Sequence, residues 1–90
     1  MKGYIIMTIN KSSEGEKLTL ALSGRLDTNS SPALEAELKQ SVGGVKELIF
    51  DFSEVEYISS AGLRILLAAQ KVMNRQGGMK LVGVSADVME

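Results

Sequence analysis

The chain has 90 residues, of which 44% are hydrophobic, a length near the lower limit at which one hydrophobic core is stable. It contains no cysteine and no histidine, which excludes disulfides, thiolate metal sites, nearly all zinc sites and any catalytic triad with a histidine base. Ten basic and eleven acidic residues give a net charge of -1, so no positive field would attract nucleic acid. We therefore expect one domain over residues 1–90 with no cofactor, no metal and no direct contact with nucleic acid.

The N-terminal stretch MKGYIIMTIN has one basic residue and an apolar run that is too short for a signal peptide. No segment approaches the ~20 apolar residues that a membrane-spanning helix requires. The absence of cysteine agrees with a reducing compartment. The sequence thus predicts a cytoplasmic protein without a membrane span.

A β-hairpin is expected at the start of the chain. Residues 4–9 are apolar and β-branched, residues 12–16 have the composition of a turn, and residues 17–24 place alternate leucines on one face. Two antiparallel strands account for this pattern.

The polar loop 25–32 leads into the first predicted helix. Pro32 suits the first helical position and Ser31 the position of the cap. The helix should end at the pair Gly43-Gly44. Its apolar stripe is formed by Leu34, Leu38 and Val42.

The second half of the chain predicts a strand, a helix and a strand. Residues 45–53 include a continuous apolar run, which is typical of a strand buried on both faces. A helix over 60–76 should stop at the next glycine pair, and residues 79–84 form the last strand. Residues 85–90 have a capping serine and the first turn of a further helix.

This order of elements predicts an α/β fold. Strand-helix-strand connections favour parallel pairing of the second, third and fourth strands, while the N-terminal β-hairpin supplies an antiparallel partner. We expect a four-stranded, mostly parallel mixed sheet with two full helices and a C-terminal helix that is truncated.

Two adjacent serines, Ser59 and Ser60, precede the second predicted helix. As the N-cap, Ser59 would accept a backbone N–H, a contact that stabilises a helix by about 1 kcal/mol. Ser60 would then point outward at the positive end of the helix dipole, where a phosphate is favourable. Ala61 and Gly62 keep the first turn bare, which would let a partner approach closely. Spacing alone leaves both interpretations open, and capping is the simpler one.

Other candidate sites are weaker. Asp51, Glu54 and Glu56 could hold Mg²⁺ or act in acid–base catalysis, but no base or phosphate-binding loop accompanies them, so we interpret them as a solvated loop after a strand-end Asp. The second helix has a wide apolar surface, which indicates either a well-buried helix or an exposed docking ridge. Its two stripes are Leu63-Leu66-Leu67 and Ile65-Ala69-Val72.

Two segments resemble a known family. The stretch LIFDFSEVEYISSAGLRILL, residues 48–67, is similar to the phosphorylation-site segment of STAS domains, in particular those of bacterial anti-sigma factor antagonists. The stretch LTLALSGRLDTNSSPALEAEL, residues 18–38, resembles the strand, Gly-x-Leu-Asp turn and first helix of the same family. Many members have Asp where this chain has Ser59, and members usually continue with a full helix after the last strand.

The resemblance implies roles for particular residues. It identifies Ser60 as the phosphorylated serine and places Asp27 in a turn beside it. The partner-binding residues that it implies are Asp27, Ser59, Ser60, Ala61, Gly62 and Leu63.

The function implied by the resemblance is partner switching by a protein that is a substrate and not an enzyme. The unphosphorylated form would bind an anti-sigma factor that is also a serine kinase, releasing the sigma factor, and a metal-dependent serine phosphatase would reset the phosphorylated form. The alternative is a STAS module of a transporter or a lipid-transport complex that interacts or senses a ligand without phosphorylation. The short C-terminal segment also predicts an uncovered apolar sheet face, through which the chain would self-associate.

Overall fold

The four strands form one mixed sheet and lie in it in chain order, with the first two strands antiparallel and the other neighbours parallel, as predicted. The computed structural model describes residues 7–84, so the expected strand residues 4–6 and the helical turn at 85–90 lie outside the described part. The elements in chain order are β1 (Met7–Glu14), β2 (Lys17–Leu26), α1 (Ser31–Ser41), β3 (Glu47–Ile58), α2 (Ser60–Asn74) and β4 (Gly78–Val82).

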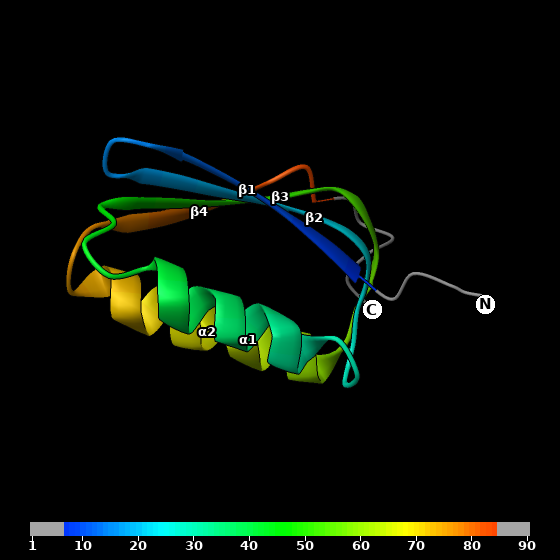
Figure 1. Ribbon diagram of the computed structural model, residues 1–90. Coiled ribbons are helices and arrows are strands. Elements are labelled where there is room, and N and C mark those ends of the chain that lie inside the picture. Colours follow the sequence, from blue (N-terminus) through cyan, green and yellow to red (C-terminus); the bar gives the residue numbers. More distant parts are fainter. Residues whose placement is uncertain (1–6, 85–90) are drawn as a thin grey trace.

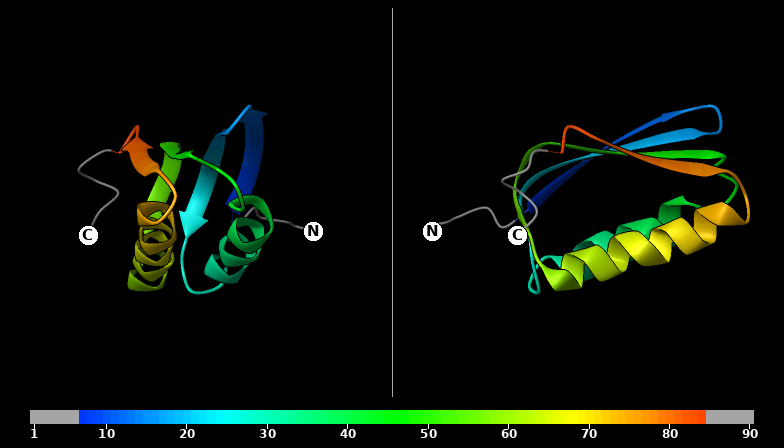
Figure 2. Two further views of the ribbon diagram at one scale, coloured as in Figure 1. Left: turned by 90° about the vertical axis from the view of Figure 1, so that its left-hand side faces the viewer. Right: turned by 180° about the vertical axis from the view of Figure 1, so that it is seen from behind.

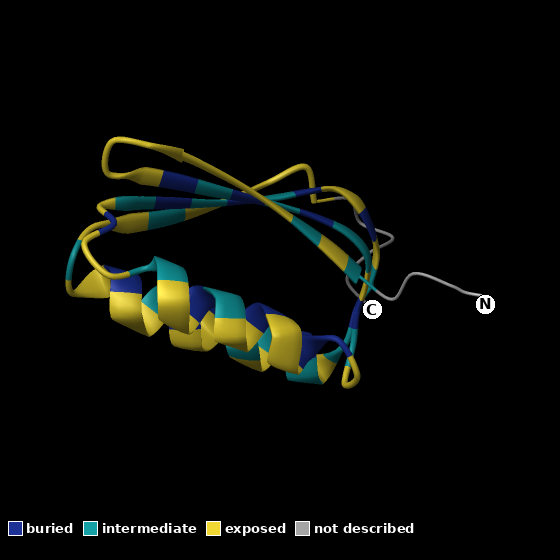
Figure 3. Cartoon of the chain, viewed as in Figure 1, coloured by how far each residue is buried: buried dark blue, intermediate teal, exposed yellow. Residues whose placement is uncertain are grey.

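Both helices lie on one face of the sheet, side by side, and both begin at the same end of the molecule (Figures 1 and 2). Buried residues occur in the helices and in the sheet (Figure 3), and their side chains form one hydrophobic cluster. From the central strands these include Leu20, Leu22, Phe50 and Phe52, and from the helices Leu34, Leu38, Leu66, Ala69 and Met73. Burial of this apolar surface is what holds the helices on the sheet.

The hairpin is longer than the sequence predicted. Strand β1 continues to Glu14, through two serines that we assigned to a turn, because its ladder with β2 extends to the pair Glu14 and Lys17. The turn is therefore only two residues long. Gly15 begins it with φ of 64°, a left-handed conformation that glycine adopts without strain.

The prediction that Ser31 caps α1 was wrong. The N-cap is Ser30, and its side chain makes no capping hydrogen bond. The Ser30 hydroxyl instead accepts from the Asp27 amide at 2.9 Å and donates to the Arg25 carbonyl at 2.6 Å. The Ser31 hydroxyl donates to the Asp27 carbonyl at 2.6 Å. Both serines therefore fasten the loop after β2 to the start of α1.

Strand β3 also corrects a prediction, because it continues past residue 53 to Ile58. The neighbouring strand β2 extends to Leu26 and pairs with β3 as far as Ile58, with register shifts after Ala21 and Gly24. Gly24 has φ of 97°, which suits the irregular backbone there.

The acidic residues that we placed in a solvated loop therefore lie within β3. Glu54 and Glu56 are exposed on the strand, and Asp51 is not at its end. An oxygen of Asp51 accepts hydrogen bonds from the Ser53 amide, at 2.9 Å, and from the Ser53 hydroxyl. The side-chain bond, followed by the backbone bond, lowers the pKa of Asp51. Within residues 7–84, no group of three potential ligands could hold a metal ion.

Helix α2 begins at Ser60 as predicted, and each of its two apolar stripes is only partly buried. Leu66 and Ala69 lie in the core, whereas Leu67 is 64% exposed and Val72 is 41% exposed. The helix therefore both packs on the sheet and presents apolar side chains to solvent. The helix ends at Asn74, two residues earlier than predicted. No helix within residues 7–84 is long and apolar enough to cross a membrane.

Candidate functional site

The start of α2 is built around Ser59. Its backbone is extended, and its hydroxyl accepts a hydrogen bond from the Gly62 amide at 3.3 Å, so Ser59 is the N-cap that the sequence predicted. Its own amide donates to the carbonyl of Leu26 at 2.8 Å. Ser59 thus fastens the beginning of α2 to the end of β2.

Ser60 is the first residue of α2 and is exposed to solvent. The first turn contains no acidic residue, so no carboxylate competes for the positive end of the helix dipole. The second serine of the pair is therefore not needed for capping. It presents a hydroxyl where an added anion would be stabilised.

Gly62 has a different structural role from the predicted one. We expected it to leave space for a partner, but it is buried against the end of β2. A Cβ atom at this position would lie 2.7 Å from Cγ of Leu26 and 3.0 Å from its carbonyl oxygen. Glycine is favoured here because even a methyl group would force Leu26 or the helix to shift.

Ala61 and Leu63 are half-buried and lie beside Ser60 in the first turn of α2. Each therefore keeps part of its surface available at this end of the helix. Among the predicted partner-binding residues on α2, only Gly62 is buried.

Asp27 directly follows β2, and the structure brings it to the end of the sheet where α2 begins. One of its oxygens accepts from the amides of Asn29, at 3.0 Å, and Ser30, at 3.1 Å, and from the Ser30 hydroxyl at 3.3 Å. Partial burial alone would raise the pKa of this carboxyl, but these hydrogen bonds together with the nearby charge of Arg25 hold the pKa below its ordinary value. Asp27 is therefore ionised and its first oxygen is fully used within the loop.

Arg25 and Tyr57 form a neighbouring pair that no motif in the sequence indicated. The guanidinium carbon of Arg25 lies 4.5 Å from the centre of the Tyr57 ring, and its Nε lies 3.6 Å from the second oxygen of Asp27. The two residues are opposite each other in the parallel ladder of β2 and β3. Their proximity depends on a register that follows two irregularities, so sequence pattern alone could not reveal it.

A family comparison agrees with this arrangement. The family described as "Mlab, STAS domain" matches residues 9–90. The chain belongs to the STAS domain family. This match includes both segments whose resemblance to STAS domains was noted in the sequence, and the serine pair stands at the predicted boundary between strand and helix.

Individual proteins resemble this STAS domain over most of its length. A putative anti-sigma factor antagonist, BtrV, from Bordetella bronchiseptica is 36% identical over 75 residues, which are 81% of this chain and 65% of that protein. The crystal structure of an anti-sigma factor antagonist from Mycobacterium paratuberculosis aligns with TM-score 0.76 and 28% identity, covering 83% of this chain and 65% of the other. This STAS domain thus spans about two thirds of the length of each of these proteins.

A third comparison concerns the fold alone. The structure of the anti-sigma factor antagonist SpoIIAA in its unphosphorylated form aligns with TM-score 0.79 at 18% identity, covering 90% of this chain and 74% of the other. The four-stranded mixed sheet with two helices is therefore the STAS fold.

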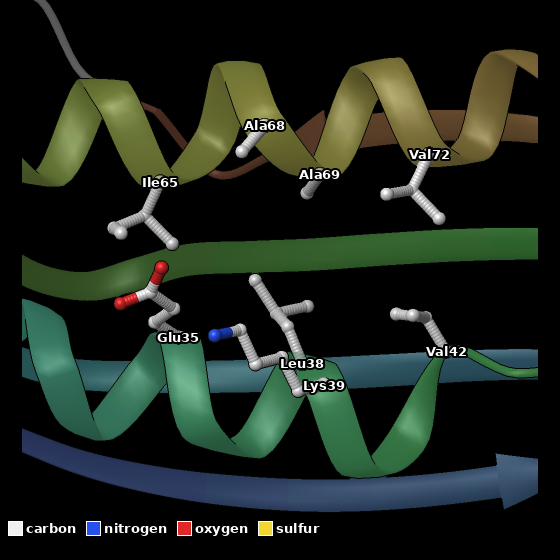
Figure 4. A pocket seen from close by; sticks show the side chains of 8 residues that line it. All are labelled: Glu35, Leu38, Lys39, Val42, Ile65, Ala68, Ala69 and Val72. Atoms are coloured by element: carbon white, nitrogen blue, oxygen red, sulfur yellow. The ribbon is translucent and has the colours of Figure 1, made fainter.

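The structure also has two apolar grooves along α2, the second of which reaches Leu63. The first groove has a volume of about 130 Å³ and lies between α1 and α2. Its lining is apolar except for Glu35 and Lys39 on the α1 side (Figure 4). The other lies between α2 and β4. Its lining residues are Leu63, Leu66, Leu67, Gln70, Met79 and Leu81.

Proposed function

We propose that this STAS domain is an anti-sigma factor antagonist that works by phosphorylation-controlled partner switching, with Ser60 as the phosphorylated residue. The observation that carries this proposal is the exposed hydroxyl of Ser60 in the first turn of α2, beside a separate serine that already caps the helix. The similarity to BtrV, itself described as a putative anti-sigma factor antagonist, supports the same function.

In the unphosphorylated state, the domain binds an anti-sigma factor that is also a serine kinase and thereby releases the sigma factor. The binding surface is the end of the molecule at which both helices begin. Ser60 would enter the kinase site, and Ala61 and Leu63 contribute apolar contact next to it. Ser59 and Asp27 act differently, because their hydrogen bonds hold α2 and the loop after β2 in place.

Phosphorylation changes the charge of this surface without disturbing the fold. A phosphoryl group adds about -1.5 to -2 charges at pH 7. At the first position of α2 this charge is stabilised by the helix dipole, so the domain stays folded. The same charge repels carboxylates of the bound kinase, and the complex dissociates. A metal-dependent serine phosphatase restores the binding state.

The test is an intact-mass measurement after incubation with ATP and an anti-sigma factor serine kinase of the same organism. One added phosphate, located on Ser60 by phosphopeptide mapping and absent from Ser60→Ala, is the expected result. Phosphate on Ser59, or full incorporation into Ser60→Ala, would contradict the assignment. Binding of a partner with no phosphorylation at all would favour the alternative, an interaction or ligand-sensing module of a transporter or lipid-transport complex.

The sequence predicted self-association through an uncovered sheet face. We further propose self-association through a different surface, the groove between α2 and β4. Leu67 and Leu81 border this groove and are 64% and 44% exposed. Exposed apolar side chains next to an edge strand favour contact with another copy. Sedimentation at micromolar concentration should show a dimer that Leu67→Glu converts to monomer. A monomeric wild-type chain would show that this surface is not a contact between copies.

A further inference from the structure

We propose that Arg25 and Tyr57 form a second contact region for the same protein partner, at which Arg25 binds a carboxylate of that partner. This inference rests on the proposed function, because it concerns the surface next to Ser60. It adds a specificity-determining residue that lies outside the phosphorylation-site segment.

The geometry of the pair is that of a preorganised contact. Stacking at 4.5 Å on the Tyr57 ring and the 3.6 Å approach to Asp27 both restrict the long side chain of Arg25. The side chain nevertheless remains 53% exposed. An arginine that is held in place before binding loses less conformational entropy when a partner docks.

The guanidinium also retains donors for a ligand. Only its Nε faces Asp27, whose other oxygen is occupied by the loop amides and the Ser30 hydroxyl. Among residues 7–84, the structure shows no hydrogen bond from the two Nη groups of Arg25. Two parallel N–H donors match the two oxygens of a carboxylate, a geometry that a lysine cannot provide.

The pair is close enough to Ser60 to share its partner. Tyr57 precedes Ser60 by three residues, which in extended chain corresponds to about 10 Å. A protein interface of standard size covers about 800 Å² on each partner, a patch of roughly 16 Å radius. Tyr57, and Arg25 paired with it, therefore lie within the radius of an interface centred on Ser60. Arginine and tyrosine are also the residue types that most often dominate binding energy.

The surrounding charges indicate what the partner surface looks like. Glu54 and Glu56 are exposed on β3 near Tyr57, so acidic side chains lie on the β3 side of the pair. A partner must place its carboxylate on Arg25 and keep other acidic groups away from the two glutamates. Such a pattern fixes the orientation of the partner and rejects surfaces that are acidic throughout.

The experiment uses titration calorimetry to measure binding of an anti-sigma factor serine kinase of the same organism to wild type, Ser60→Asp, Arg25→Glu and Lys80→Glu. Lys80 is a matched control, because it is also exposed and its ammonium lies 3.6 Å from the Glu47 carboxylate. Lys80→Glu changes the net charge of the domain by the same amount as Arg25→Glu. We expect Arg25→Glu to weaken binding at least about tenfold, and Lys80→Glu to leave it within about twofold. Arg25→Gln removes the charge without introducing an opposite one and should also weaken binding. It replaces Arg25→Glu in the comparison if Arg25→Glu does not fold.

The outcomes separate the two proposals. If Ser60→Asp releases the kinase but Arg25→Glu and Arg25→Gln bind like wild type, the inference is wrong and the proposed function stands. If Arg25→Glu and Lys80→Glu weaken binding equally, the effect is one of net charge, which also overturns the inference. If the wild-type domain does not bind the kinase, both proposals fail.

Discussion

Gly62 provides the sharpest test of how α2 is positioned. Substitution by alanine would place a Cβ atom 2.7 Å from Cγ of Leu26, a fully buried side chain, and 3.0 Å from the Leu26 carbonyl oxygen. Overpacking costs about 1–3 kcal/mol, and because this Cβ atom would also meet a backbone oxygen, we take the upper part of that range, about 2–3 kcal/mol. Alanine gains about 1 kcal/mol over glycine in a helix, which offsets part of this cost. We expect Gly62→Ala to lower the free energy of unfolding by about 1–2 kcal/mol, which for a domain of this size lowers Tm by roughly 4–16 °C.

The assay is urea and thermal unfolding of wild type, Gly62→Ala and Gly43→Ala. A Cβ atom at Gly43 would meet nothing within 4 Å, and its φ is not positive, so Gly43→Ala should have nearly wild-type stability. In a Leu26→Ala background, the cost of Gly62→Ala should fall by at least about 1 kcal/mol, because the crowded side chain is gone. The reasoning is refuted if Gly62→Ala is as stable as wild type, or if its cost is unchanged without the Leu26 side chain.

Three further outcomes test the end of the molecule where the helices begin. Ser60→Asp should raise the free energy of unfolding by about 0.3–1 kcal/mol in urea titrations, because it adds a negative charge to an exposed first turn; a marked loss of stability would mean that Ser60 is buried. Ser59→Ala removes the cap and should lower the free energy of unfolding by about 0.5–2 kcal/mol, whereas Ser59→Asp keeps a capping oxygen and should be as stable as wild type. Equal melting curves for the two variants would argue against capping. The folded state holds the pKa of Asp27 below its ordinary value, so the stabilisation by its ionised form is present at neutral pH and is lost as pH falls below about 4. In thermal melts from pH 6 to pH 2.5, wild type should therefore lose more stability than Asp27→Asn, and parallel curves would contradict this.

Most of the fold could be predicted because its signals are local. The alternating leucines of β2 are buried in the core, and the stripe residues Leu34 and Leu38 lie under α1. Ser59 was expected as a cap and makes the predicted hydrogen bond, since capping depends on residues three positions apart. Strand ends were predicted less well. The serines of β1 and the acidic residues of β3 have turn-like composition, but pairing with β2 extends both strands.

What the sequence by itself determined about this protein was its class, its order of elements, its STAS resemblance and the exposed second serine at a helix start. These depend on periodicity, helix punctuation and short motifs, all of which are local properties of the chain. Only the tertiary structure decided that Gly62 packs on Leu26 and that Arg25 stacks on Tyr57. In both pairs the residues are more than thirty positions apart in the chain. Contacts of that kind depend on strand register and on how closely a helix approaches the sheet, which the side chains of the whole core set together.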